Sequence, residues 1–408
     1  MYITRKIESK IAKYLDAPEI LVLIGPRQSG KTTLLKQIQS KLQESIYLTF
    51  EDIELLDLFE KDPKAFLFKY QSYKYIFIDE FQYSKQGGKI LKYIYDTQPN
   101  LKLIISGSSA LDLTVKAVKY LVGRVFVLNM YQLDFEEFLQ FKSKDLFQLY
   151  LSYQRQFNLN ISQVVQDQFY PLWEEFVLYG GYPRVVTEAD LEIKQEILKN
   201  ILNTYFLREV RDIIGLADDF KLLKLIQTLA NQTGNLINYN SLGDITEYDY
   251  ATLKKYINIL DKTYIANTIR PFYKRKTNEL TKSPKVYFYD SGLRNYVLNN
   301  FNTLENRLDK GFLAENFVFT QLLKKGIEPQ FWRTKNDQEV DFVYQDGVDI
   351  VALECKSNFK ETEIGSSSIL SFINKINPSK LYIVNHKFFG AIKIQAGSKA
   401  FGVPYWLI

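Results

Sequence analysis

The sequence predicts an α/β protein whose first part is a parallel, doubly wound sheet. Between residues 20 and 130, short strand-forming runs alternate with amphipathic stretches, a pattern typical of βαβ units. A glycine loop, GPRQSGKT, separates the first strand from the first helix, and a strand ending in two carboxylates, YIFIDE, follows further along the chain. These three observations together predict a P-loop NTPase core.

The glycine loop carries the residue types that a phosphate site requires. At Gly25 and Gly30 a Cβ would obstruct the turn that points backbone N–H groups at phosphate oxygens. Lys31 supplies positive charge to the β- and γ-phosphates, and the Thr32 hydroxyl can ligate Mg²⁺. We therefore expect ATP and Mg²⁺ as cofactors. The residues expected to bind the nucleotide are Gly25, Arg27, Gln28, Ser29, Gly30, Lys31, Thr32 and Thr33.

The strand YIFIDE supports the same interpretation. In P-loop NTPases an Asp at the end of a neighbouring strand holds Mg²⁺, a role that Asp79 fits. Glu80 is then the candidate base for the water that attacks the γ-phosphate. The alternative is that both carboxylates belong to a solvated turn. The sequence thus predicts Thr32 and Asp79 as Mg²⁺ ligands and Glu80 as a catalytic residue.

Two further candidates follow later strands of the predicted sheet. The run LII ends in SGSS, where Ser106 or Ser108 is placed to sense the γ-phosphate, because ligands of open α/β sheets bind at the carboxyl ends of strands. A turn without ligand contact is the alternative. Arg124 precedes the strand VFVL and is a candidate for stabilising γ-phosphate charge, in cis or from a neighbouring subunit; a surface salt bridge is the other interpretation.

Composition limits the remaining chemistry. The chain has 408 residues, with one cysteine, Cys355, and one histidine, His386. A lone cysteine fits a reducing compartment, and a lone histidine disfavours histidine-based zinc or triad chemistry. No apolar run approaches the ~18 residues that span a bilayer, and no signal-peptide pattern opens the chain. The sequence therefore predicts a cytoplasmic protein without a membrane partner.

Pattern changes along the chain predict four domains. Residues 1–133 form the ATPase core. Residues 134–215 are largely helical and are expected to form a lid over the nucleotide. Residues 216–300 contain three helices and a β-hairpin, the order of a winged helix-turn-helix, and residues 301–408 form a final α/β domain.

The hairpin region is the most basic part of the chain. Residues 249–289 hold nine lysines and arginines against three acidic residues, although the whole chain has a net charge of only +5. The loop around Lys274, Arg275 and Lys276 also carries aromatic side chains, a combination suited to DNA or RNA. Winged helices also bind proteins, and basic loops are often only solvated, so both alternatives stay open.

The last domain contains a second group of candidate site residues. Glu354 and Lys356 are two apart on a predicted strand and share a face. If the preceding hairpin loop has two or four residues, Asp341 lies on that same face, and Glu315 can reach it from a helix. Such a group can bind Mg²⁺ through Asp341, Glu354 and Glu315 and act on a phosphodiester with Lys356 as a catalytic group. A solvated ladder of ion pairs is the alternative.

Taken together, the motifs resemble a prokaryotic family of AAA-type ATPases with a C-terminal domain of unknown function. The resemblance rests on GPRQSGKTTLL, YIFIDEFQ, IISGSSA, LVGR, YGGYPRVV, SPKVYFYDSGL, GFLAENFV, EVDFV and ALECKS. It implies an AAA-like core, a winged-helix segment and a restriction-endonuclease-like C-terminal fold. It also implies ATP binding at Gly30, Lys31, Thr32 and Asp79.

The leading hypothesis is a Mg²⁺-dependent ATPase switch coupled to a C-terminal module that binds or cleaves nucleic acid. The alternative is a nucleotide-gated scaffold that binds proteins and carries an inactive nuclease-like domain. A homo-oligomer or a protein partner is compatible with both hypotheses.

Overall fold

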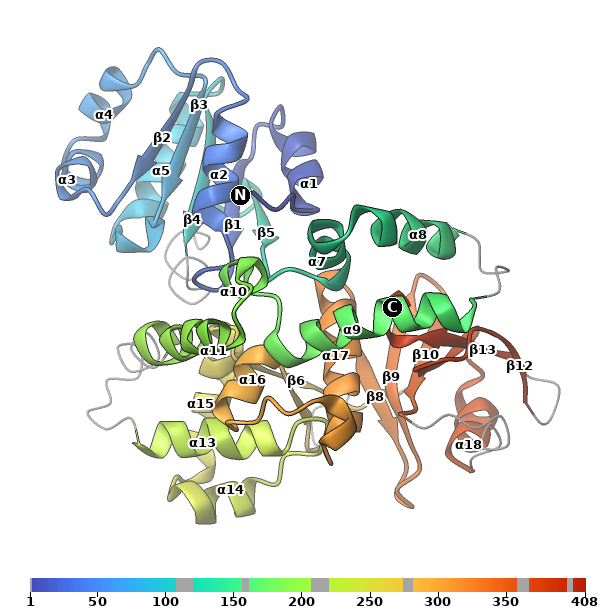
Figure 1. The fold of residues 1–408 in the computed structure, drawn as a ribbon. Helices are drawn as coiled ribbons and strands as arrows, with labels where there is room; N and C mark the ends of the chain where they lie inside the picture. Colours follow the sequence, from blue (N-terminus) through green and yellow to red (C-terminus); the bar gives the residue numbers. More distant parts are fainter. Residues whose placement is uncertain are drawn as a thin grey trace. The chain divides into compact units, whose positions relative to one another are not determined.

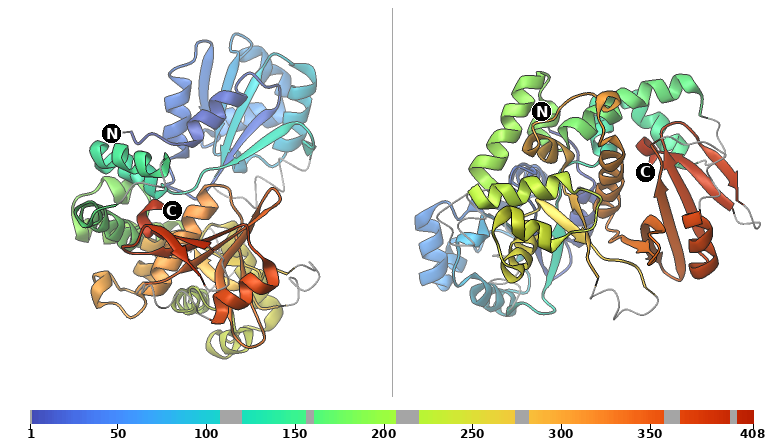
Figure 2. Two further views of the ribbon diagram at one scale, coloured as in Figure 1. Left: turned by 90° about the vertical axis from the view of Figure 1, so that its right-hand side faces the viewer. Right: turned by 90° about the horizontal axis from the view of Figure 1, so that it is seen from below.

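The computed structural model of the chain describes residues 2–107, 120–155, 161–206, 220–273, 282–357, 367–394 and 399–408 (Figures 1 and 2). The chain divides into two compact units. The first contains Met1–Leu133, Tyr182–Arg184 and Lys262–Tyr264. The second contains Asp134–Gly181, Val185–Asp261 and Ile265–Ile408.

The first unit is built on a five-stranded parallel sheet, as the alternating pattern predicts. Its strand order is β2-β3-β4-β1-β5. The strands are β1 (Ile20–Ile24), β2 (Ser45–Thr49), β3 (Tyr75–Asp79), β4 (Lys102–Gly107) and β5 (Val125–Asn129). The helical elements are α1 (Ile7–Tyr14), α2 (Lys31–Gln39), α3 (Ile53–Lys61), α4 (Pro63–Lys69), η1 (Phe81–Tyr83) and α5 (Gly87–Thr97). β1, which leads into the phosphate loop, and β3, the YIFIDE strand, both pair parallel with β4. Their carboxyl ends therefore lie at the same edge of the sheet, one strand apart.

The strands of this sheet are apolar on both faces because helices cover both faces (Figure 1). On one face, Leu21 and Phe77 belong to a core that includes Leu34 of α2. On the other face, Val22 and Ile76 pack in a core with α3, α4 and α5. Successive strand residues point to opposite faces, so a strand covered on both sides needs an uninterrupted apolar run.

The second unit begins with helices. They are α7 (Phe135–Lys142), α8 (Lys144–Arg155), α9 (Gln163–Tyr179), α10 (Pro183–Thr187, shared with the first unit), α11 (Leu191–Asn200) and the π-helical η3 (Ile201–Phe206). Within this unit α9 packs on the end of the chain: Phe169 stacks on Trp406 with ring centroids 3.9 Å apart, and Trp173 stacks on Tyr405 at 5.4 Å. The role of this segment as a lid stays a prediction.

Three helices and a hairpin follow in the order that the sequence predicts. The helices are α13 (Phe220–Asn231), α14 (Tyr239–Thr246) and α15 (Tyr250–Lys262). Strands β6 (Ala266–Ile269) and β7 (Lys285–Phe288) pair antiparallel, with Ile269 opposite Lys285. The basic loop of Lys274, Arg275 and Lys276 lies outside the described residues.

The C-terminal part contains a six-stranded mixed sheet of order β12-β13-β11-β10-β9-β8. Its elements are α16 (Ser291–Val297), η5 (Leu304–Asn306), α17 (Lys310–Lys324), β8 (Gln330–Arg333), β9 (Glu339–Asp346), β10 (Asp349–Cys355), α18 (Ser367–Ile376), β11 (Lys380–Asn385), β12 (Gly390–Lys393), β13 (Lys399–Pro404) and η8 (Tyr405–Leu407). Ile369 and Phe372 of α18 pack on Val340, Val343 and Ala352 of the sheet. β10 pairs parallel with β11 and antiparallel with β9.

The hairpin of β9 and β10 has one of the two loop lengths that the sequence analysis considered. Asp346 pairs with Asp349, so the loop has two residues, and Gly347 adopts the left-handed conformation at φ 62°. The register runs on to the pair Phe342–Leu353. The next pair in this register sets Asp341 opposite Glu354, on one face of the hairpin.

Two motifs quoted for the family resemblance hold the second unit together. A Cβ on Gly180, whose φ is 78°, would lie 2.1 Å from the Asp290 carboxylate, and one on Gly292 would lie 2.0 Å from the Tyr179 carbonyl oxygen. The Asp290 carboxylate accepts hydrogen bonds from the backbone N–H of Gly181 at 2.8 Å and of Leu293 at 2.9 Å. YGGY and YDSGL therefore have a structural role: the Asp290 carboxylate packs too closely on Gly180, and the Tyr179 backbone too closely on Gly292, for either glycine to carry a side chain.

Within the described ranges, no helix is both long and apolar enough to cross a bilayer.

Candidate nucleotide site and a buried carboxylate–lysine cluster

The glycine loop joins β1 to α2 in the geometry that a phosphate site requires. Gly30 lies at the start of α2 with φ 96°, in the left-handed region that favours glycine. The Lys31 ammonium curls back over the loop and donates to the carbonyl oxygens of Gly25 at 2.9 Å and Pro26 at 2.8 Å. Thr32 and Thr33, on the first turn of α2, are exposed.

Gly25 is required for a reason that the sequence did not reveal. Its Cβ would lie 2.0 Å from the carbonyl oxygen of Met130, just after the neighbouring strand β5. The buried Arg5 also supports the loop, because its guanidinium donates to the carbonyl oxygens of Ser29 and Tyr131, each at 2.7 Å. The shape of the loop is therefore set partly from outside the motif.

Asp79 at the end of β3 is the centre of the site. Its carboxylate accepts hydrogen bonds from the hydroxyls of Thr32 at 2.5 Å, Tyr47 at 2.7 Å and Ser106. Burial alone would raise the pKa of Asp79, but the hydrogen bonds from Ser106, Thr32 and Tyr47 outweigh it and hold the pKa below its usual value. The structure thus brings Thr32 and Asp79 together with a carboxylate that stays ionised.

Glu80 follows Asp79 in a left-handed backbone conformation, with φ 54°. Its carboxylate accepts a hydrogen bond from the Gln82 side chain. Burial and then the charge of Asp79 raise the pKa of Glu80. A raised pKa makes this carboxylate the better proton acceptor of the two.

The remaining candidates of the first unit have different outcomes. Ser106 contacts Asp79, whereas Ser108 lies outside the described residues. Arg124 lies immediately before β5, at the amino edge of the sheet, and its guanidinium pairs with Asp96 at 3.0 Å. The structure therefore does not bring Arg124 to the phosphate loop of its own chain and shows the salt bridge; a role toward a neighbouring subunit stays a prediction.

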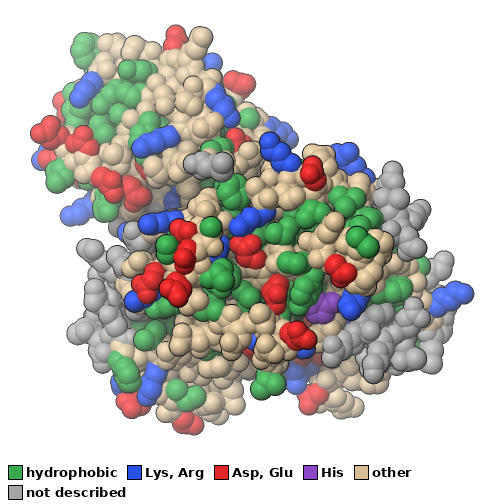
Figure 3. All heavy atoms as spheres, in the orientation of Figure 1, with side chains coloured by type: hydrophobic (Ala, Val, Ile, Leu, Met, Phe, Trp, Pro, Cys, Tyr) green, Lys and Arg blue, Asp and Glu red, His purple; other side chains and the backbone are tan. Residues whose placement is uncertain are grey.

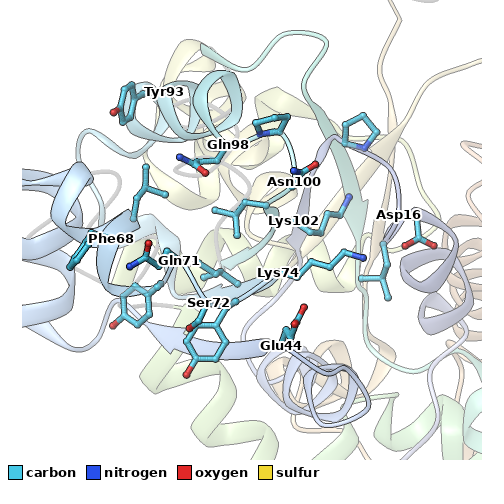
Figure 4. A pocket seen from close by; sticks show the side chains of 18 of the residues that line it. Asp16, Glu44, Phe68, Gln71, Ser72, Lys74, Tyr93, Gln98, Asn100 and Lys102 are labelled. Carbon is cyan, nitrogen blue, oxygen red and sulfur yellow. The ribbon is translucent and has the colours of Figure 1, made fainter.

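A cavity of about 860 Å³ lies at this same amino edge (Figure 4). Lys102, at the start of β4, lines it and donates to the carbonyl oxygens of Ala17 at 2.6 Å and Glu19 at 2.5 Å. Burial lowers the pKa of Lys102 to about 8. The phosphate loop leaves the opposite, carboxyl edge, so this cavity is separate from the nucleotide site.

The second unit holds the predicted C-terminal group, and its members do converge. Glu354 accepts a hydrogen bond from Lys356 at 2.7 Å, and Asp341 accepts one from the backbone N–H of Cys355 at 2.8 Å. Burial and then the charge of Asp341 raise the pKa of Glu315 to about 7 and that of Glu354 to about 8. The charge of Asp341 thus acts on both Glu315 and Glu354.

The sequence analysis missed the residue at the middle of this group, Lys285 of β7. Its ammonium lies 3.2 Å from Glu315 and 3.9 Å from Asp341, and it also pairs with Glu339. Burial alone would lower the pKa of Lys285, but Glu315, Asp341 and Glu339 outweigh it and raise the pKa above its usual value. We call Lys285, Glu315, Glu339, Asp341, Glu354 and Lys356 the carboxylate–lysine cluster.

The cluster does not fit the predicted Mg²⁺ site in this arrangement. Over the residues that the structure describes, no three His, Cys, Asp or Glu side chains are spaced to hold a metal ion. Two ammonium groups already supply positive charge to the carboxylates, and Tyr287 donates a hydrogen bond to Glu315. Lys285 lies beside Glu315 and Asp341, and Lys356 beside Glu354; metal binding by Asp341, Glu354 and Glu315 stays a prediction.

The parallel sheet, the glycine loop and the adjacent Asp79 define a P-loop nucleotide-binding protein. Comparison with known families agrees: residues 17–139 match the family described as AAA domain, residues 170–304 match domain of unknown function DUF8612, and residues 310–404 match domain of unknown function DUF4143. Residues 17–139 thus carry an AAA domain, and two domains of unknown function follow it, as the resemblance implies.

Its relatives are uncharacterized proteins of prokaryotes. A protein of Haemophilus influenzae is 27% identical, covering 87% of this chain and 87% of the relative. A protein of Methanocaldococcus jannaschii is 28% identical, covering 99% of this chain and 90% of the relative.

Among solved structures, a Walker-type ATPase of Pyrococcus abyssi is similar over 73% of this chain and 96% of its own, with 15% identity and a TM-score of 0.49. The ORC2 protein of Aeropyrum pernix in its ADP form is similar over 74% of this chain and 94% of its own, with 13% identity and a TM-score of 0.36. The assignment to nucleotide-binding proteins comes from the sheet, the loop and the family match.

Proposed function

We propose that this protein is a Mg²⁺-dependent ATPase switch whose second unit binds nucleic acid. The observation that carries the proposal is Asp79, an ionised carboxylate hydrogen-bonded to Thr32 beside the phosphate loop. A hydroxyl and a carboxylate that converge at the end of a P-loop form the donor set that suits Mg²⁺.

Each residue of the nucleotide site then has a separate task. Lys31 leaves the carbonyl oxygens of the loop and binds the β- and γ-phosphates. Thr32 and Asp79 would hold Mg²⁺, which neutralises phosphate charge when bound. Glu80 orients the attacking water and accepts its proton, and Ser106 holds the Asp79 carboxylate in place.

The three helices and hairpin of the second unit support nucleic-acid binding. A groove of about 780 Å³ runs between them. Its lining includes the basic side chains of Lys254, Arg270 and Lys282 and a single acid, Asp261. Tyr239 and Tyr250 lie in the same groove with ring centroids 5.0 Å apart, so phosphate-binding charge and stacking surface are available together.

The C-terminal sheet supports binding more than cleavage. The order α17, β8, β9, β10, α18, β11 and the E-x-K pair fit the restriction-endonuclease-like fold that the family resemblance implies. Lys285 among the carboxylates favours an inactive descendant of such a site. The same observation keeps the second candidate function, a nucleotide-gated protein scaffold, in competition with the first.

ATP binding and phosphate release, measured with and without DNA or RNA, test the proposal. Lys31→Ala should abolish ATP binding, because it removes the charge that faces the phosphates. Glu80→Gln should keep binding but reduce turnover by about 10²- to 10⁴-fold, since only the proton acceptor is altered. Lys61→Ala, at an exposed lysine on α3, is the control. Turnover of Glu80→Gln at the wild-type rate would disprove the base assignment.

Nucleic-acid binding by the second unit is tested by a separate measurement. Lys254→Gln with Lys282→Gln should lower the salt dependence of DNA or RNA binding by about 0.9 units of slope for each phosphate that the protein no longer neutralises. Unchanged affinity and slope at low salt would favour the scaffold.

A further inference from the structure

A cavity of about 850 Å³ lies in the second unit, between α9, the start of α17 and the turn after β11. The residues lining it include Tyr170 and Trp173 of α9, Lys310 of α17, Ser357 after β10, and His386 and Lys387 after β11. β10 and β11 are parallel, so the cavity opens at their carboxyl ends, the edge where α/β sheets bind ligands.

The wall of the cavity is aromatic. The His386 ring lies 5.8 Å from the Tyr170 ring and 5.2 Å from the Trp173 ring, centroid to centroid. Burial, then Lys310 and Lys387, lower the pKa of His386 to about 4, so the imidazole is neutral near pH 7 and offers a ring face rather than a charge. Figure 3 shows this single histidine at the surface, with basic and acidic side chains around it.

Charged side chains of both signs line the cavity: Lys310 and Lys387 are basic, and Glu305 and Asp167 are acidic. Ser357 lies 3.9 Å from the position of a Cβ on Gly311, in the first turn of α17. The amino end of a helix attracts anions, and Lys310 is the first residue of this one. Burial, then Glu174 and Glu305, raise the pKa of Tyr170.

Hydrogen bonds hold the turn after β11, which carries Lys387. The Asn385 side chain accepts from the backbone N–H of Lys387 at 2.9 Å, and the Gln166 side chain donates to the Lys387 carbonyl oxygen. The basic side of the cavity is thus preorganised.

We propose that this cavity binds a nucleotide unit. The phosphate lies against Lys310, Lys387, Ser357 and the amino end of α17, and the base stacks on Tyr170 and His386. The exocyclic amino groups of the base face Glu305. The unit comes either from a free mononucleotide or from the end of a nucleic-acid strand, and the site is separate from the phosphate loop.

The test uses the full chain carrying Lys31→Ala, so that the phosphate loop does not bind the probes. AMP and a 5′-phosphorylated deoxyadenosine decamer, whose bases both carry an exocyclic amino group, are titrated, with intrinsic tryptophan fluorescence as the signal. Tyr170→Ala should weaken binding by about 5- to 150-fold, which corresponds to about 1–3 kcal/mol for one stacked base. Lys387→Gln should weaken binding and lower the salt slope by about 0.7 for a single strand.

Matched variants separate the site from general effects. Lys380→Gln removes an exposed lysine from the opposite end of β11 and should bind as the parent does. Tyr170→Phe keeps the ring and should recover most of the binding that Tyr170→Ala loses. Binding of AMP alone supports a free nucleotide, and preference for the phosphorylated decamer over an unphosphorylated one supports a strand end. Absence of binding by either probe at millimolar concentration, or binding insensitive to Tyr170→Ala and Lys387→Gln, overturns the proposal whatever the outcome of ATP turnover.

Discussion

Buried carboxylates occur in both units, but their charges are stabilised in opposite ways. Asp79 receives hydrogen bonds from three neutral hydroxyls, which stabilise its charge without cancelling it. Glu315 and Glu354 share their surroundings with two lysines and have raised pKa values. A carboxylate held by hydroxyls still offers its charge to an external cation, whereas the carboxylate–lysine cluster contains its own counter-ions. Carboxylates that look alike in the sequence therefore differ in chemistry: Asp79 can bind an external cation, whereas the carboxylates of the cluster already have lysine partners.

The largest effect is expected from removing the Lys285 ammonium, the cation inside the carboxylate–lysine cluster. Lys285→Met should lower the free energy of unfolding by about 3–5 kcal/mol, because it leaves buried carboxylates without their partner. Urea unfolding measures this change, and Lys61→Met, which breaks an exposed pair with Asp57, should cost about 0–1 kcal/mol. A similar small cost for both lysines would mean that the cluster is solvated and does not depend on Lys285.

The pH dependence of the unfolding free energy is a second test of the difference between the two groups of carboxylates. Glu315 and Glu354 have folded-state pKa values above their unfolded value, so the folded state binds more protons and stability falls as pH rises from about 4.5 through about 7 and 8. Glu354→Gln should flatten this fall by roughly 1–3 kcal/mol between pH 5 and 8. Asp79 has a lowered pKa, so its contribution is lost only below its unfolded value of 3.8. Denaturant unfolding at several pH values measures the slope, and equal slopes for wild type and Glu354→Gln would contradict the prediction.

A smaller effect is expected at the nucleotide site. Tyr47→Phe removes one of the hydroxyl donors to Asp79, and hydrogen bonds to charged groups contribute about 1.5–3 kcal/mol. The variant should therefore need more Mg²⁺ for half-maximal ATP turnover while keeping ATP binding. Tyr14→Phe, at another tyrosine of the same unit, serves as the control. An unchanged Mg²⁺ requirement would show that Thr32 and Ser106 suffice to hold Asp79.

The smallest effect is expected at Arg124. Because it pairs with Asp96 at the amino edge of the sheet, Arg124→Ala should change the turnover of a dilute, monomeric sample by less than about 0.5 kcal/mol in activation free energy. Turnover that falls more steeply, and only as protein concentration rises, would instead support a role in a neighbouring subunit.

Much of the fold could be predicted because its signals are local. The glycine loop, the apolar runs and the Gln345–Gly347 turn signal each identify their element within a few residues; the two-residue length of the hairpin loop comes from the structure. Even the convergence of Asp341 and Glu354 follows from strand alternation and loop length.

The site residues that the sequence analysis did not predict depend on contacts between segments far apart in the chain. Tyr47 reaches Asp79 only because β2 pairs with β3, and Lys285 meets Glu315 only because β7 packs beside α17. Arg5 has no motif at all; its role comes from the carbonyl oxygens that happen to face it. A clearer signal existed for Lys285, since a lysine that begins the apolar run VYFY must be paired if it is buried.

The close approach of Tyr179–Gly180 to Asp290–Gly292 has an evolutionary consequence. Neither glycine can be replaced while the other segment keeps its position, so substitutions at Gly180, Asp290 and Gly292 should be inherited together or not at all. Lys31 and Glu80 are under a separate selection for ATP turnover, because a protein that loses turnover still keeps this packing. Descendants that have abandoned catalysis should therefore still carry YGGY and YDSGL, and these motifs, rather than the phosphate loop, would mark the lineage.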